Sequence, residues 1–121
     1  MPTPSPLLPV IRFNQALNDR DLDTALACLS DDTVFENTYP PPDGERYAGK
    51  AAVSAFWRDF LSGAEALHFE TEEVFALGDR AVLRWRYTWT NAAGESGSIR
   101  GVDIYRVQGG LIVEKLSYVK G

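Results

Sequence analysis

The chain has 121 residues with a net charge of −5 at neutral pH, and 45% of its residues are hydrophobic. That length and composition fit one globular domain with a sizeable core, and exclude two ordinary domains, a disordered chain or a membrane-spanning protein. The acidic balance disfavours nucleic acid and anionic lipid as partners, and no secretory signal is recognisable, so we expect a cytoplasmic protein.

Cysteine and histidine are too sparse to suggest a metal site. Cys28 has no second cysteine with which to form a disulfide, and no cysteine and histidine pair has the spacing of a zinc site. We interpret Cys28 as a small buried hydrophobic residue, and His68, near the start of a predicted strand, as structural or solvent-exposed. The sequence therefore predicts neither a metal nor a cofactor.

The first half of the chain follows helical periodicity. Residues 1–6 contain three prolines and are predicted to be a flexible leader to a single domain over 7–121, because proline removes backbone donors. Apolar residues at helical spacing indicate a first helix, and a second, short helix is expected to follow Asp21, which can cap it. The second helix is expected to end at the run 30–32, and a strand to follow over 33–37. The residues that define the two helices are Val10, Phe13 and Leu17, then Leu22, Ala25, Leu26 and Leu29.

A proline-rich loop separates this strand from the clearest helix of the sequence. Residues 38–44 contain three prolines, which exclude both helix and central strand. The helix that follows has Gly63 available as its C-terminal cap. Its large apolar side chains form one stripe, which must pack against a large apolar surface. The stripe consists of Val53, Phe56, Trp57, Phe60 and Leu61.

From residue 67 onward the sequence alternates with a period of two. Four strands joined by glycine-containing turns are expected over 67–77, 80–91, 97–108 and 111–119. They are predicted to form an antiparallel meander, which makes the chain an α+β domain with its helices on one face of the sheet. One face of the second strand, with Ala81, Leu83, Trp85, Tyr87 and Trp89, is predicted to point inward, either as plain core or as the wall of a cavity.

The outward face of the same sheet is unusually apolar. Arg84, Arg86, Arg100 and Arg106 lie on it, either solvated or paired with acids of a second copy. The apolar residues between them are more than a small monomer normally leaves exposed, so we expect a homodimer. These residues are Val82, Val102, Ile104, Leu116 and Tyr118.

The last hairpin allows a prediction of which side chains face one another. A three-residue loop over 108–110 places Asp103 opposite Lys115, and Gly101 opposite Ser117, on the side that carries Tyr105. A two-residue loop instead places Asp103 opposite Leu116. In the first case an aspartate and a lysine stand together inside the domain, either as a buried pair that fixes the register or as a polar site that contacts a ligand.

Four short segments carry a resemblance to a known family. They are Ala16–Leu22, Ser30–Phe35, Gly78–Val82 and Arg100–Val107. Their order and spacing resemble a SnoaL-like or ketosteroid-isomerase-like member of the nuclear transport factor 2 superfamily over residues 7–119. The resemblance implies a cone in which three helices close the mouth of a curved antiparallel sheet, a ligand in the hollow interior and a dimer through the convex face. Members include isomerases, dehydratases, cyclases, hydrolases and plain binding modules, so the fold does not assign the function.

The functional residues of the family's branches are mostly absent from this sequence. The isomerase branch uses a tyrosine, a base carboxylate and an aspartate, where this chain has Phe13, Asn37 and Asp103. Phenylalanine has no hydroxyl and asparagine takes no proton at neutral pH, so two of the three groups are missing. The hydrolase branch matches no better at Arg84–Arg86 and Ser117, and cyclases often carry a histidine or aspartate where Lys115 and Ser117 stand.

These comparisons lead to a hypothesis about the site. The chain is expected to bind a small, largely apolar, carbonyl-bearing molecule, with or without cofactor-free proton transfer by Asp103 and Lys115. Asn37 is expected to orient the ligand, and Tyr39 to be either a lid residue or simply exposed. The alternative is a non-enzymatic ligand-binding or protein-interaction domain. The residues expected to contact the ligand are Phe13, Asn37, Tyr39, Trp57, Trp85, Tyr87, Trp89, Tyr105 and Ser117.

Overall fold

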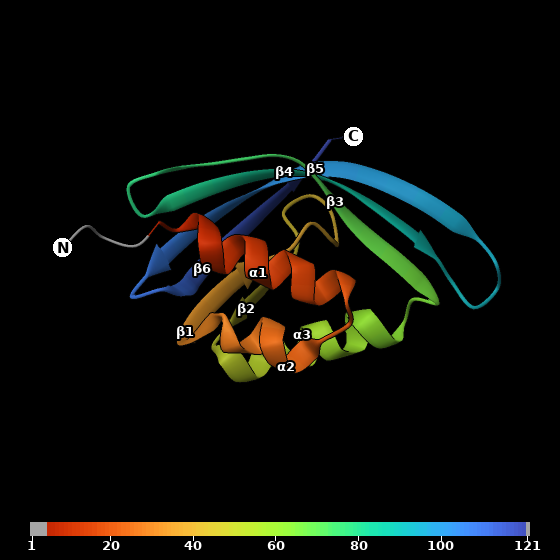
Figure 1. Cartoon of the computed structure of the whole chain (residues 1–121). Helices are drawn as coiled ribbons and strands as arrows, with labels where there is room; N and C mark the ends of the chain where they lie inside the picture. The colour runs from red at the N-terminus through yellow and green to blue at the C-terminus, as the bar shows by residue number, and fades with distance from the viewer. Residues whose placement is uncertain (1–4, 121) are drawn as a thin grey trace.

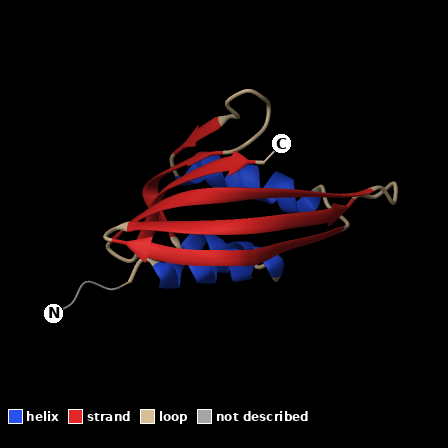
Figure 2. Cartoon of the chain, turned by 90° about the horizontal axis from the view of Figure 1, so that it is seen from above, coloured by secondary structure: helices blue, strands red, loops and turns tan. Residues whose placement is uncertain are grey.

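A computed structural model describes residues 5–120 as a curved six-stranded sheet with three helices against its concave face (Figure 1). Viewed from above, the sheet lies in front and the helices lie behind it (Figure 2). The α+β architecture expected from the sequence is confirmed. In chain order the elements are α1 (Leu7–Asn18), α2 (Leu22–Ala27), β1 (Leu29–Glu36), β2 (Arg46–Ala48), α3 (Lys50–Ser62), β3 (Ala66–Leu77), β4 (Arg80–Thr90), β5 (Ser96–Gln108) and β6 (Leu111–Val119).

The three predicted helices are present, and their apolar stripes form the core. Val10, Phe13 and Val53 are fully buried, which confirms the inward faces assigned to α1 and α3. Pro6, at the end of the predicted leader, is buried and occupies the N-cap of α1, while residues 1–4 of that leader lie outside the described residues. Asp21 caps α2 as predicted, because its side chain accepts from the backbone N–H of Thr24.

The predicted end of α2 was wrong, because one residue assigned to the helix belongs to the next strand. Leu29 was assigned to the apolar face of that helix, but it is the first residue of β1, where it is buried. The strand therefore begins before the predicted 33–37, and the run 30–32 lies inside it rather than ending a helix. The physical reason is that Leu29 pairs with Ile112 of β6, so a long-range contact overrides the local helical spacing.

The sheet order is β2-β1-β6-β5-β4-β3. The four C-terminal strands form the predicted antiparallel meander. Two features of the other edge were not foreseen: β1 pairs in parallel with β6, and the short strand β2 pairs with the end of β1. The sheet brings the end of β1 beside the middle of β6, with Phe35 opposite Lys115.

The last hairpin has the two-residue turn that was the alternative, but beyond the turn its register differs from both predicted registers. Val107 pairs with Ile112 next to the turn, but Tyr105 pairs with Lys115 and Asp103 with Ser117. The turn is therefore the two-residue type, with positive φ at Gly109 and Gly110, and a β-bulge beyond it shifts the register by one more residue. Compared with the register of a three-residue loop, the shorter turn and the bulge together move the pairing by two residues. The side chains that were expected to share the inner face therefore still share it.

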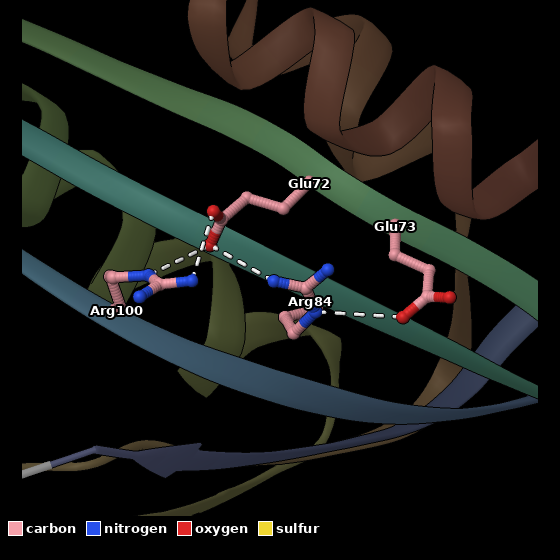
Figure 3. Close-up of polar contacts among 4 residues, drawn as sticks. All are labelled: Glu72, Glu73, Arg84 and Arg100. Atoms are coloured by element: carbon pink, nitrogen blue, oxygen red, sulfur yellow. Dashed lines mark hydrogen bonds and ion pairs between the residues drawn. The ribbon is translucent and has the colours of Figure 1, made fainter.

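A second β-bulge, in β3, organises charges on the outer face. Glu72 is the extra residue there, between the pairs formed by its neighbours. It receives two hydrogen bonds from Arg100, of 3.0 and 3.1 Å, and lies 3.7 Å from Arg84 Nη1 (Figure 3). Arg84 also lies 3.5 Å from Glu73. Two of the outward arginines are thus paired within the chain. The paired arginines also hold the pKa of Glu72 below its usual value, first through the Arg100 hydrogen bonds.

Within residues 5–120, every helix is too short or too polar to cross a bilayer.

Candidate functional site

A cavity of about 350 Å³ lies between α3 and the inner face of the sheet. Its walls come from four regions: the end of β1 with the loop that follows, one side of α3, the middle of β3 to β5, and β6. Most of the lining is aromatic. The lining residues are Phe35, Asn37, Thr38, Tyr39, Phe56, Trp57, Phe60, Phe69, Trp85, Tyr87, Ile99, Lys115 and Ser117.

The aromatic wall is a set of rings in direct contact across the helix and the sheet. Phe60 of α3 lies 5.5 Å from Tyr87 of β4, between ring centroids, and Tyr87 stacks on Phe69 of β3 at 4.8 Å. Trp57 meets Phe56 and Phe60 edge-on at 5.0 and 5.3 Å. Such contacts give a rigid apolar wall with few rotatable bonds, which suits a flat or ring-containing ligand.

Glycine on β5 makes room for the widest side chain of this wall. Gly101 pairs with Trp85, and a Cβ on Gly101 would lie 2.5 Å from Trp85 Cζ2 and overlap the Tyr118 carbonyl oxygen. Trp89 and Gly97 repeat the arrangement four residues along each strand. The absence of a side chain therefore lets the Trp85 ring lie across β5 inside the sheet's curve.

One end of the cavity is polar, and Lys115 is its central residue. The lysine side chain is only 10% exposed. Its ammonium Nζ donates to Ser117 Oγ at 2.7 Å and lies 3.7 Å from Asp103 Oδ2. The same Nζ lies 5.3 Å from the ring centre of Phe35 and 5.6 Å from that of Trp57. A carboxylate, a hydroxyl and two aromatic faces together compensate for taking this charge out of water.

Asp103 lies behind the lysine rather than in the cavity wall. Its side chain is 5% exposed, and its Oδ2 accepts from the Tyr105 hydroxyl at 3.1 Å. Its Oδ1 is buried without a hydrogen-bond partner in the described part of the chain. The Tyr105 hydroxyl in turn accepts from Asn14 Nδ2 of α1 at 3.1 Å. A continuous polar path therefore leads from α1 through the core to the cavity.

Tyr105 keeps its proton in this setting. The ring is fully buried, and burial raises the pKa of its hydroxyl well above the usual value. The negative charge of Asp103 raises the same pKa further, because a phenolate beside a carboxylate is unfavourable. Tyr105 is therefore a neutral hydrogen-bond donor to Asp103.

The mouth of the cavity is formed by the proline-rich loop after β1. Asn37 Oδ1 accepts from the backbone N–H groups of Tyr39 and Glu45, at 3.3 and 3.0 Å. That oxygen is thus engaged in holding the loop. Tyr39 lines the cavity but remains 74% exposed. The loop ends at Gly44, where a positive φ and the closeness of the Asn37 carbonyl leave no room for a Cβ.

The structure brings together most, but not all, of the predicted site residues. Lys115 and Ser117 lie in the cavity wall with Asn37, Tyr39, Trp57, Trp85 and Tyr87. Asp103 and Tyr105 stand directly behind Lys115. Phe13 is fully buried and meets Phe35 and Trp57 edge-on, so it supports the wall without forming part of it. Trp89 stacks on Tyr87 at 5.4 Å but lines a separate shallow groove near the end of the sheet.

Several cavity residues were missed at the sequence level. Phe56 and Phe60 were recognised in the stripe of α3 but not assigned to the site, and period-two alternation on β3 could have indicated Phe69. Phe35 and Ile99 carry no local signal that separates a cavity residue from a core residue. Asn14, on the buried face of α1, was missed as well; a polar residue on an apolar helical stripe was the available signal.

The chemistry open to this arrangement is that of hydrogen bonding and proton transfer. The wall contains a single ammonium group, several hydroxyls and one side-chain amide, but no carboxylate among the described residues. Residues 5–120 also contain no group of three histidine, cysteine or acidic side chains placed to hold a metal ion. The buried indole N–H groups of Trp57 and Trp85 have no acceptor within the described chain.

Comparison with known proteins shows both sequence and fold similarity. The family described as SnoaL-like domain matches residues 10–115. An NTF2-like protein of unknown function from Mesorhizobium loti is 38% identical, with 100% of this chain and 98% of that chain covered and a TM-score of 0.83. A Mycobacterium tuberculosis protein, crystallised in complex with estradiol-17β-hemisuccinate, is 28% identical over 95% of this chain and 94% of that one, with a TM-score of 0.83.

Similarity at lower identity extends to a protein from Xanthomonas campestris that is provisionally named a polyketide cyclase. It is 21% identical over 95% of this chain and 90% of that chain, with a TM-score of 0.83, which shows a shared fold alone. No curated protein matches the chain.

Proposed function

We propose that this chain, which belongs to the SnoaL-like domain family, binds a small, largely apolar molecule through a carbonyl oxygen. The observation that carries the proposal is the position of Lys115 and Ser117 at the polar end of a cavity that is otherwise mainly aromatic. The rings would enclose the apolar body of the ligand, and the lysine and serine would donate to its oxygen.

The size and lining of the cavity support a ligand of this kind. Its volume of about 350 Å³ falls within the range of roughly 300 to 1,000 Å³ that is typical of small-molecule sites. Sites of this type have mostly apolar walls with a few polar groups that set the orientation. The related Mycobacterium tuberculosis protein was crystallised with an estradiol ester, a ring-containing molecule that carries oxygen acceptors.

A charged ligand head is less favourable in this site than a neutral one. Asp103 lies 3.7 Å from Lys115, so the pair has no net charge when both groups are ionised. An additional buried anion would face this neutral pair without a cation of its own, which is costly in a poorly solvated cavity. A ketone or aldehyde oxygen requires only hydrogen-bond donors.

Proton transfer is a second candidate function, and the contact between Asp103 and Lys115 favours it. Asp103 does not line the cavity, so it would act on a ligand through Lys115. The lysine would stabilise the enolate oxygen that forms when the ketone passes a proton from its adjacent carbon to a water molecule in the cavity. Binding without turnover is favoured instead by the lack of a carboxylate in the wall of the cavity, within the described residues.

Binding can be tested with methyl naphthyl ketone, a flat aromatic ketone. Trp57 and Trp85 lie in the cavity wall, so we expect the ketone to change the intrinsic fluorescence on titration. Loss of a hydrogen bond to the charged lysine in Lys115→Met should weaken binding by about tenfold or more. Lys120→Met, at an exposed lysine, is the matched control and should bind as the wild type does. Equal binding by all three proteins would reject the assignment of Lys115.

Proton transfer is tested separately with the same ketone. Exchange of its methyl hydrogens in deuterated water, followed by NMR, measures enolisation without knowledge of the natural substrate. Exchange faster than the buffer rate, abolished in both Lys115→Met and Asp103→Asn, would support acid/base chemistry. Exchange at the buffer rate, with the ketone bound, would leave this site with a binding function only.

Association of two copies through the convex face of the sheet is also proposed. The outer surface leaves Phe75, Leu77 and Tyr118 exposed by 52%, 84% and 51%. Phe75 shares the outer face of β3 with Glu73, and Tyr118 lines one groove with Glu72, Arg84 and Arg100. The ion pairs of Glu72, Glu73, Arg84 and Arg100 are drawn in Figure 3. An apolar surface with charged groups beside it is typical of a homodimer interface.

A further inference from the structure

The hydrogen bonds behind the cavity have a direction that can be worked out from Asn14. One terminal atom of its side chain lies 2.9 Å from the Val10 carbonyl oxygen and 3.1 Å from the Tyr105 hydroxyl. A carbonyl oxygen can only accept, so this atom is the amide nitrogen Nδ2. Both contacts are therefore donated by Asn14, and the Tyr105 oxygen is the acceptor of one of them.

The next step follows from the single proton of Tyr105. Its oxygen accepts from Asn14, and its proton lies toward Asp103 Oδ2 at 3.1 Å. The raised pKa of Tyr105 ensures that the hydroxyl keeps this proton. Asp103 Oδ2 thus accepts from Tyr105 on one side and faces the Lys115 ammonium on the other.

The last step determines what the cavity presents to a ligand. An ammonium group has three N–H donors and no acceptor. Ser117 accepts one from Lys115, and Asp103 faces another, so one N–H remains for the cavity. Because Ser117 Oγ accepts from Lys115, its own proton is also free to point into the cavity. The polar end therefore offers two donors from adjacent groups.

We propose that Asn14 and Tyr105 are positioning residues that orient Asp103 and Lys115, so that the site prefers a ligand oxygen that can only accept. The preferred ligand is then a ketone or aldehyde rather than the matching alcohol. This inference rests on the carbonyl-binding function proposed above and adds the residues that set its selectivity.

The selectivity follows from counting hydrogen bonds. A ketone oxygen has two lone pairs and accepts from both Lys115 and Ser117. An alcohol oxygen can also accept both, but its own proton is then left without a partner in a buried site. If the alcohol donates to Ser117 instead, the hydrogen bond from Ser117 is lost. In either arrangement one hydroxyl proton, that of the alcohol or that of Ser117, has no acceptor. A buried donor without an acceptor typically weakens binding by about tenfold.

The experiment compares three probes of nearly equal shape. They are methyl naphthyl ketone, the secondary alcohol formed by its reduction, and the isopropenyl analogue in which carbon replaces the oxygen. Dissociation constants are measured by tryptophan fluorescence and calorimetry on the full chain. We expect the ketone to bind about tenfold more tightly than the alcohol, with the isopropenyl compound also weaker than the ketone.

Three variants test the path of hydrogen bonds. Tyr105→Phe removes the donor to Asp103, so the free N–H of Lys115 should turn toward that carboxylate and away from the ligand. Asn14→Leu removes the donor that orients Tyr105, and Ser117→Ala removes the second cavity donor. We expect the ratio of ketone to alcohol affinity to fall toward one in Tyr105→Phe and Asn14→Leu. Ser117→Ala should instead weaken the binding of both probes and keep the preference for the ketone, because the alcohol's proton then has no acceptor at all. Thr33→Val is the matched control, since Thr33 is also fully buried and its hydroxyl has no partner within residues 5–120.

The outcomes separate this inference from the proposed function. If none of the three probes binds the wild-type protein, the proposed function fails. If the ketone and the alcohol bind with equal affinity, or if the ratio is unchanged in a folded Tyr105→Phe or Asn14→Leu protein, the positioning role is wrong. A ratio that falls in these two variants, while Ser117→Ala and Thr33→Val keep it, supports the inference. Melting curves identify which of the two path variants folds, and either one decides the question.

Discussion

Replacement of Lys115 by methionine should destabilise the protein strongly, because it leaves the Asp103 carboxylate buried without its cation. Methionine fills most of the space of the lysine stem, so the lost charge dominates the effect. The Asp103 side chain is 5% exposed, and among the described residues its remaining partner is the Tyr105 hydroxyl. Removing one partner of such a buried pair typically costs about 3 to 5 kcal/mol.

The reverse change should cost less, because Lys115 has other partners. In Asp103→Asn the ammonium keeps its 2.7 Å hydrogen bond to Ser117 and its contacts with Phe35 and Trp57. The new amide oxygen can still accept from Tyr105. We therefore expect a loss of roughly 1 to 3 kcal/mol, the usual range for an imperfectly satisfied polar group. The two partners of one ion pair should thus respond unequally.

Urea denaturation of the two single variants and the double variant measures these differences directly. The double variant should be more stable than Lys115→Met, since it removes the unpaired carboxylate. If Asp103→Asn is more destabilising than Lys115→Met, the partners assigned to Lys115 do not support it as argued. A loss below about 1 kcal/mol in Lys115→Met would show that the pair is solvated rather than buried.

Three further predictions concern stability and assembly. Burial and the Asp103 charge raise the pKa of Tyr105, so above about pH 10 the unfolded chain loses this proton before the folded protein does, and stability falls as pH rises. Tyr105→Phe should therefore lose less stability at alkaline pH than the wild type, and an identical loss would contradict the burial argument. Gly101→Ala should lower stability by about 1 to 3 kcal/mol, because its Cβ would lie 2.5 Å from Trp85 Cζ2. Gly63→Ala is the control and should be tolerated, because the nearest contact of its Cβ would be at 3.4 Å. Equal urea midpoints for the two variants would count against this packing. Light scattering should give about twice 13.4 kDa for the wild type and a monomer for Phe75→Glu, and a monomeric wild type would refute association through the convex face.

The elements of the fold could be predicted because their signals are local. The stripe of α3 and the alternation of the four C-terminal strands depend on neighbouring residues, and both were confirmed. The end of α2 could not be placed correctly, because Leu29 fits a helical stripe as well as it fits a strand. Its pairing with Ile112 joins distant parts of the chain, which local spacing does not report. The parallel pairing of β1 with β6 is invisible in the sequence for the same reason.

The contact between Asp103 and Lys115 was predicted from a register that turned out to be wrong. The pair is diagonal, since Lys115 stands opposite Tyr105 and Asp103 opposite Ser117. The β-bulge after the turn has no marker in the sequence, because Val113 looks like any strand residue. The contact nevertheless forms, because a shift by two residues keeps all these side chains on one face and long side chains reach diagonal neighbours.

The sequence predicted most residues of the candidate site, but not which of them line the cavity and which lie behind its wall. Alternation assigns Asp103, Tyr105 and Lys115 to one face, yet it does not show which of them reaches the cavity. That depends on the curvature of the sheet and on how α1 and α3 pack against it. Lys115 reaches the cavity wall because of its long stem, whereas Asp103 remains behind it. Asn14 completes the path from another part of the chain, 91 residues before Tyr105.

A crystal structure of the complex with methyl naphthyl ketone tests the central claim most directly. We expect the naphthyl rings against the aromatic wall that contains Phe60, Tyr87 and Trp57, with the ketone oxygen within hydrogen-bonding distance of both Lys115 Nζ and Ser117 Oγ. A ketone bound in the cavity with its oxygen toward the proline-rich loop, or bound only outside the cavity, would contradict the assignment of Lys115 and Ser117 as the groups that hold a ligand.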